Sequence, residues 1–172
     1  MTVISTNPES RVEKFVEALV ARLREINPVN TPLGAAYAYG TTVREVSRRF
    51  ADINSLTRDN CPKLFIGVAN QREQQRPGRR CRITLDIAIA GGVYAPNESD
   101  TERDKIESRL QDFYTDVRRA ILSDGTIGDQ SIFIQFKETQ FDEGIFFPAG
   151  LFVASLEAVL DIQAGDPAST GW

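Results

Sequence analysis

Residues 62–91 read PKLFIGVANQREQQRPGRRCRITLDIAIAG, and they decide how the chain folds. A short apolar run, Leu64–Val68, comes first, and apolar residues occupy every second position from Cys81 to Ile89, as in a strand with one buried face. Between these runs lies the segment Arg72–Arg82, which carries five arginines and one acid and contains a turn-forming Pro-Gly pair. The stretch therefore predicts two strands joined by a projecting, arginine-rich hairpin loop.

Two amphipathic helices are expected, one before and one after this hairpin. Asn7-Pro8 is a good helix start, and apolar residues follow with helical spacing from Val12 to Ile26. Ser99, with Glu102 three residues later, is a capping-box pattern that starts the second helix, and the sequence Ser123-Asp124-Gly125 ends it. Each helix has a single apolar side, so each is expected to cover a sheet.

Three further strands complete the expected order. Residues 41–50 fit either a strand or a helix, and their β-branched residues favour the strand. Alternating apolar residues predict the other two strands, over Ile132–Lys137 and Phe152–Ile162. The order α-β-β-β-α-β-β predicts one α+β domain over residues 1–162, in which a mostly antiparallel sheet of four to five strands carries both helices on one face. Residues 163–172 are expected to form a flexible tail.

Composition excludes several classes of protein. A length of 172 residues, with 41% hydrophobic and 26% charged residues, is typical of one soluble globular domain. The absence of histidine excludes Ser-His-Asp and Cys-His nucleophile systems and the usual catalytic zinc sites, so no catalytic residue, metal or cofactor is expected. Cys61 and Cys81 are expected to be buried thiols, with a disulfide as the alternative. No apolar run is long enough to span a membrane and no signal sequence is present, so we expect a protein made in the cytosol.

The charge is unevenly distributed along the chain. Residues 124–172 carry eight acids and one base, whereas the segment Arg72–Arg82 has a net charge of +4. Opposite charges favour contacts between copies of the chain, and a solvated loop and tail is the alternative. The connection Thr139–Gly150 contains four large apolar residues, which are expected to meet another chain or to fold back on the core. The candidate interface residues are Arg72, Arg76, Arg79, Arg80, Arg82, Phe141, Phe146 and Phe147.

Several features together resemble the tail terminator, or tail completion, proteins of long-tailed bacteriophages. They are the opening helix, the basic-aromatic stretch Val43–Phe50, the strand Cys61–Gly67, the arm Gln71–Arg82, the long strand into Ala90, the capped helix and the final hairpin. The resemblance implies a small α+β subunit without a catalytic role, which forms a hexameric ring on the end of the tail tube and stops tube growth. It also implies a surface for the neck or head-tail connector, and a place in the virion tail after assembly in the host cytoplasm. The acidic C-terminal half adds the hypothesis that DNA passes through an acidic lumen without specific binding.

Other functions remain as alternatives at this stage. The nearest is a head-tail connector component or a minor tail protein, because these are also small subunits that join rings. A nucleic-acid binder would use Arg44, Arg48 and Arg49, which lie close to two tyrosines in the sequence, together with the arginines of the hairpin loop. A small enzyme would have to use carboxylates, for which Asp86 and Glu157 are the conceivable partners.

Overall fold

The protein is described by a computed structural model, which covers residues 11–49, 52–78, 80–142 and 144–163. The elements are α1 (Arg11–Arg24), β1 (Glu45–Ser47), the 3-10 helix η1 (Ile53–Ser55), β2 (Lys63–Arg76), β3 (Arg80–Tyr94), α2 (Asp100–Leu122), β4 (Phe133–Phe141) and β5 (Ala149–Gln163). This order confirms the predicted α-β-β-β-α-β-β arrangement. The predicted helix start at Asn7-Pro8 and the predicted tail, apart from Gln163, lie outside the described residues.

The five strands form one mixed sheet in the order β1-β2-β3-β5-β4. Only β1 and β2 run parallel, and the other three pairings are antiparallel. The central pair, β3 and β5, is in register from Arg80 opposite Gln163 to Tyr94 opposite Ala149. The strand expected within residues 41–50 is present, but it is only three residues long.

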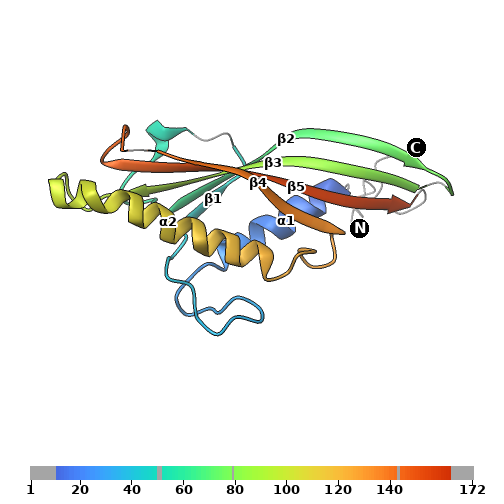
Figure 1. Cartoon of the computed structure of the whole chain (residues 1–172), viewed down its shortest axis with the longest axis horizontal. Coiled ribbons are helices and arrows are strands. Elements are labelled where there is room, and N and C mark those ends of the chain that lie inside the picture. The colour runs from blue at the N-terminus through green and yellow to red at the C-terminus, as the bar shows by residue number, and fades with distance from the viewer. Residues whose placement is uncertain (1–10, 50–51, 79, 143, 164–172) are drawn as a thin grey trace, which may run out of the picture.

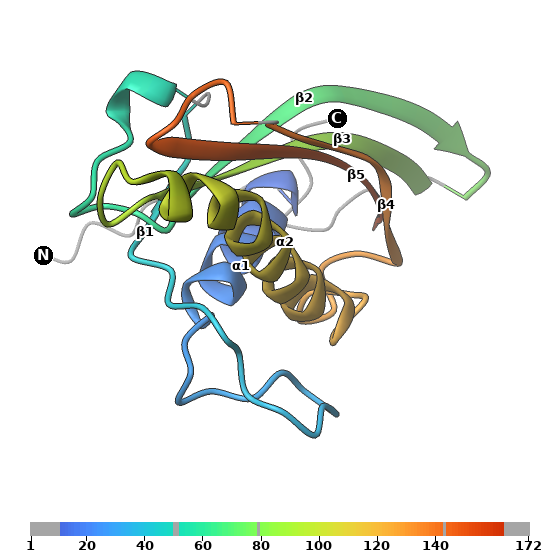
Figure 2. The same ribbon diagram turned by 60° about the vertical axis from the view of Figure 1, so that its left-hand side comes forward.

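Both helices lie on the same face of the sheet, as predicted (Figures 1 and 2). Their apolar stripes pack against the inward-facing side chains of β3 and β5, and the ring centroids of Phe113 and Phe152 are 5.6 Å apart in an edge-on contact. Among the described residues, η1 is the one helix on the other face, and its neighbour Leu56 packs over one end of that face with Phe65 and Ala90. We call this face the open face of the sheet.

The start of α2 confirms the predicted cap but only half of the capping box. The Oγ atom of Ser99 accepts a hydrogen bond from the backbone N–H of Glu102 at 3.3 Å. The Glu102 carboxylate pairs with Arg109 two turns later, while the N–H of Ser99 donates to the Oδ1 atom of Asn97. The helix ends at Leu122, immediately before the predicted stop sequence.

The predicted arginine-rich loop is wrong in extent, because most of it is strand. β2 continues to Arg76 and β3 begins at Arg80, so the connection is a tight turn in which Gly78 has a φ of 81°. Continuous pairing with β3, whose inward residues Ile83 and Leu85 are buried, holds this polar segment extended. A shift in register between Val68 and Asn70 marks where the apolar part of β2 ends and its polar part begins.

Candidate assembly surfaces

We call the outer part of the β2–β3 hairpin, Asn70–Asp86, the hairpin arm; it is exposed along β2, whereas the inward side chains of β3 are buried. Every residue of β2 from Val68 to Arg76 is exposed. Beside the turn, Arg76 and Arg80 are cross-strand partners, and neither forms an ion pair within the part of the chain that the structure describes; Arg79 lies outside it. Like charges directly opposite one another destabilise a sheet, so the tip of the arm carries positive charge that the rest of the described chain does not neutralise.

The other two predicted interface arginines are neutralised within the chain. The Nη2 atom of Arg72 lies 2.9 Å from Asp86 and 3.4 Å from Glu157, and the Nε atom of Arg82 lies 3.2 Å from Asp161. The prediction that the arginine segment and the acidic C-terminal half form separate, opposed surfaces therefore fails for these residues. The cause is the sheet order, which places β5 and its acids directly beside β3.

The carboxylate pair considered for catalysis does come together, on the open face. Asp86 and Glu157 are cross-strand partners in the β3–β5 register. Arg72 contacts both, and Lys137 and the side-chain amide of Gln135 contact Glu157 at 3.2 and 3.1 Å. The carboxylates therefore belong to an ion-pair network on an exposed sheet, and neither lines either of the described pockets.

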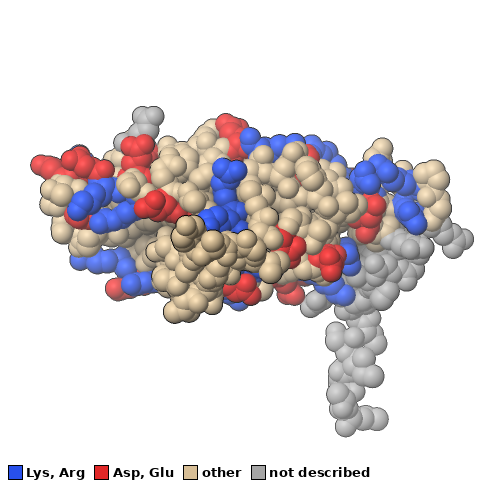
Figure 3. All heavy atoms as spheres, turned by 60° about the horizontal axis from the view of Figure 1, so that its bottom comes forward, with Lys and Arg blue, Asp and Glu red and all other residues tan. Residues whose placement is uncertain are grey.

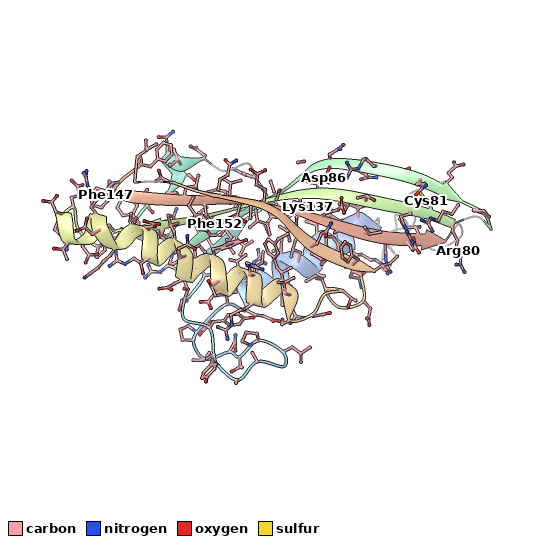
Figure 4. All side chains as sticks on the ribbon, viewed as in Figure 1. Arg80, Cys81, Asp86, Lys137, Phe147 and Phe152 are labelled. Atoms are coloured by element: carbon pink, nitrogen blue, oxygen red, sulfur yellow. The ribbon has the colours of Figure 1, made fainter. Side chains whose placement is uncertain are left out.

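The predicted interface phenylalanines fall into two groups. Phe141 and Phe147 pack against the core, and Arg103 lies 4.8 Å from the centre of the Phe147 ring. Phe146 and its neighbour Ile145 are 46% and 81% exposed at the turn between β4 and β5. Figure 4 shows Phe147 and Arg80 at opposite ends of the molecule, so the predicted interface residues do not form one patch.

Three exposed acids on α2 have no ion-pair partner among the described residues and were not predicted as a site. Asp100, Asp104 and Glu107 are spaced to share one face of the helix, and all three are exposed. None of them forms an ion pair within the described residues. We call these three residues the acidic stripe. The start of α2 and the tip of the hairpin arm lie at opposite ends of the molecule (Figure 1), so the acidic stripe of one copy lies far from its own arm tip.

The residues considered for nucleic-acid binding are partly engaged within the chain. Arg48 forms an ion pair with Glu13, and the hydrogen bond from Arg48 lowers the pKa of that carboxyl. The Nη1 atom of Arg44 donates to the backbone oxygen of Asp59 at 3.0 Å, and Tyr39 is buried at 4% exposure. Arg48 is therefore neutralised and the Tyr39 ring is not free to stack, whereas Arg49 is exposed without an ion pair among the described residues and Tyr37 is 80% exposed.

The connection from α1 to β1 carries a second exposed surface that sequence reasoning missed. We call residues 26–43 the knob; they contain no charged residue. Three large apolar side chains project from it, with Val29, Leu33 and Tyr37 at 85%, 67% and 80% exposure. Figure 3 shows this uncharged surface bulging toward the viewer between clusters of basic and acidic side chains. The uninterrupted lack of charge was the available sequence signal.

A buried carboxylate on α2 holds the base of the knob. Asp116 is 4% exposed, and its Oδ2 atom accepts hydrogen bonds from the backbone N–H groups of Gly40 and Thr41, both at 2.8 Å. Its Oδ1 atom pairs with Arg119 at 3.1 Å, and Arg119 in turn donates to the backbone oxygen of Ala38. The knob is therefore fixed to the helix layer at the point where the chain leaves it.

The two cysteines are buried free thiols, as predicted. Burial raises the pKa of Cys61 to about 11 and also raises the pKa of Cys81. Both are therefore protonated near neutral pH and are poor nucleophiles and metal ligands. Among the described residues, no group of His, Cys, Asp or Glu side chains is arranged to hold a metal ion.

A scan against models of protein families finds no match to this chain, and a search of curated proteins finds none. No helix in the described ranges has the length and apolar character needed to cross a membrane.

Proposed function

We propose that this chain is a structural subunit of a bacteriophage tail, of the tail terminator type. Copies form a ring at the end of the tail tube, stop tube polymerisation and provide the interface to the neck or head-tail connector, and DNA passes through the lumen without specific binding. The ring acts in the virion tail after assembly in the host cytoplasm, and the chain has no catalytic role.

The observation that carries the proposal is the charge at the two ends of the molecule. The arm tip holds Arg76 opposite Arg80 without a described partner, and the acidic stripe at the far end is also unpaired. A contact between two different surfaces, repeated from copy to copy, closes into a ring when the rotation allows it. This pairing of the arm with the stripe replaces the pairing with the C-terminal acids, which Arg72 and Arg82 already engage.

Charge reversal tests the ring contact directly. The double variant Arg76→Glu, Arg80→Glu should lose ring formation because the arm would then repel the acidic stripe, and loss should be seen as a shift of the 19.1 kDa chain from oligomer to monomer in sedimentation. Adding Asp104→Arg and Glu107→Arg should restore the oligomer. The matched control, Lys14→Glu with Arg58→Glu, reverses two exposed charges elsewhere and should leave assembly unchanged.

Electron microscopy with tail tubes tests the role of the ring. Wild-type rings should bind one end of a purified tube and block its growth, and the arm variant should not. Rings that form but never bind a tube end would favour the head-tail connector alternative. Assembly that is unaffected by the arm variant would refute the charge argument.

A further inference from the structure

A hollow of about 470 Å³ lies between the knob and the C-terminal half of α2. The knob supplies one wall, from Pro32 to Ala35, and α2 supplies the other, with Tyr114, Arg118 and Leu122. Its size is within the range of about 300–1,000 Å³ that is usual for binding pockets. Arg118 and Arg119 are the charged residues that line it, and none of the described residues around it is acidic. A ligand in the hollow therefore meets apolar surface and positive charge together.

The two arginines of the hollow differ in what they already bind. Arg119 is engaged within the chain, because its Nη1 atom lies 3.1 Å from the carboxylate of Asp116. Arg118 is exposed and forms neither an ion pair nor a hydrogen bond among the described residues. Its guanidinium lies over two aromatic rings, 5.8 Å from the centre of Tyr114 and 5.6 Å from the centre of Phe136. These contacts restrict the side chain without using its N–H donors, which match the two oxygens of a carboxylate.

The unpaired acids of α2 do not neutralise Arg118. The acidic stripe ends at Glu107, and the helix rises about 16 Å from residue 107 to residue 118, roughly twice the screening length at physiological salt. Asp112 is nearer along the helix, but it lies about a third of a turn around the axis and lines a separate hollow. The negative end of the α2 dipole is closer still and amounts to about half a charge. The hollow therefore keeps a net positive charge.

We propose that the hollow binds a segment of another protein that carries an aspartate or glutamate beside a large apolar side chain. The carboxylate pairs with Arg118, and the apolar side chain packs against Leu33 and Leu122, which are 67% and 46% exposed. An occupant without a negative charge would leave Arg118 buried and unpaired, so the carboxylate is the feature that selects this partner.

The surface around the hollow favours a peptide segment over a small molecule. Apolar surface continues from the hollow onto Tyr37, whose side chain is 80% exposed and whose backbone oxygen accepts a hydrogen bond from Arg119. An extended segment can cover this ring and fill the hollow at the same time. The bonds from Asp116 to Gly40 and Thr41 fix the knob before binding, so little ordering is needed. The site is separate from the ring contact, because it uses neither the hairpin arm nor the acidic stripe.

Saturation-transfer NMR with two blocked peptides tests the site, because it observes the peptide and tolerates an assembled ring. The probe is acetyl-Gly-Leu-Glu-Phe-Gly-amide, and the matched probe has glutamine in place of the glutamate. The glutamate peptide should bind with a Kd on the order of 0.1–1 mM, since the hollow admits only a few side chains. The glutamine peptide should bind at least about fivefold more weakly, and raising the salt concentration should reduce this preference.

Three variants assign the binding to the hollow. Arg118→Gln should remove the preference for the glutamate peptide, because the charge is lost and the length of the side chain is nearly kept. Leu122→Asn should weaken the binding of both peptides by a similar factor, because it removes apolar wall and keeps the charge. Both positions are exposed, so the fold should be unaffected. The matched control Arg58→Gln removes an exposed arginine elsewhere and should bind both peptides as the wild type does.

The outcomes separate this site from the ring. A preference for the glutamate peptide that disappears in Arg118→Gln, with the oligomer retained in sedimentation, supports the proposal. The same preference in the Arg76→Glu, Arg80→Glu variant supports it as well, even where the ring is lost. Equal binding of the two peptides by the wild type, or a preference that survives Arg118→Gln, overturns it. Loss of the oligomer in Arg118→Gln also overturns it, because the hollow would then belong to the contact between copies.

Discussion

Removing the buried Asp116 carboxylate should destabilise the protein more than removing any of the exposed acids of α2. The substitution Asp116→Ala leaves the backbone N–H groups of Gly40 and Thr41 without their acceptor and leaves Arg119 without its ion-pair partner. Hydrogen bonds to a charged group contribute about 1.5–3 kcal/mol each, and the partial exposure of the two N–H groups reduces the sum, so we expect a loss of about 3 kcal/mol. For a chain of this length that corresponds to a fall in Tm of about 6–12 °C.

The assay pairs thermal unfolding with hydrogen exchange. Asp112→Ala is the control, because Asp112 lies one turn earlier on the same helix, is exposed and has no partner among the described residues. It should change Tm by only a degree or two. In Asp116→Ala, the backbone amides of Gly40 and Thr41 should exchange faster than in the wild type. The amides of β3 should stay protected in the same rank order as in the wild type. A Tm equal to that of the control, or unchanged exchange at both amides, would refute the view that this carboxylate holds the knob.

Two further changes test the core and the acid response. Gly91→Ala should lower the free energy of unfolding in urea by about 1–3 kcal/mol, because its Cβ atom would lie 2.2 Å from the buried ring of Phe152. The control is Gly67→Ala, whose Cβ atom would meet nothing within 4 Å and which should leave that free energy unchanged. Equal losses in the two variants would contradict this packing. The pKa of Asp124 is lowered from 3.8, first by the hydrogen bond from the backbone N–H of Gly128, so its stabilisation is complete above that ordinary value and is lost as the pH falls through the lower folded value. Asp124→Asn should therefore destabilise the protein at neutral pH and show a smaller loss of stability than the wild type between neutral pH and about pH 3.

Local patterns predicted the elements well because each is determined by nearby residues. The helical spacing of apolar residues and the Ser99 cap located α2, and alternation from Cys81 to Ile89 located β3. The extent of β2 could not be predicted in this way, since its polar half, Asn70–Arg76, has no apolar alternation of its own. It is held extended by β3, a long-range pairing that a local pattern does not contain.

The candidate site was harder to predict, because charge counted along the sequence says nothing about which charges meet. Five arginines in one segment suggested one basic surface, yet the pairing of β5 beside β3 neutralises Arg72 and Arg82. Asp116 illustrates the opposite case: it was not singled out from the sequence, and its burial depends on a loop some 75 residues earlier in the chain.

The surfaces that remain for partners are those whose groups are not satisfied within the chain. Ion pairs formed within a folded subunit add little to assembly, because separating them to make new pairs costs about as much as the new pairs return. Arg72 and Arg82 are therefore excluded from the proposed interface, whereas Arg76 and Arg80 remain in it, although all four are arginines of one hairpin. The uncharged knob is a candidate interface for the same reason as the charged arm, because its exposed apolar side chains are not buried within the chain. The arm should bind a partner through charge and the knob through apolar contact, so the two should bind different surfaces.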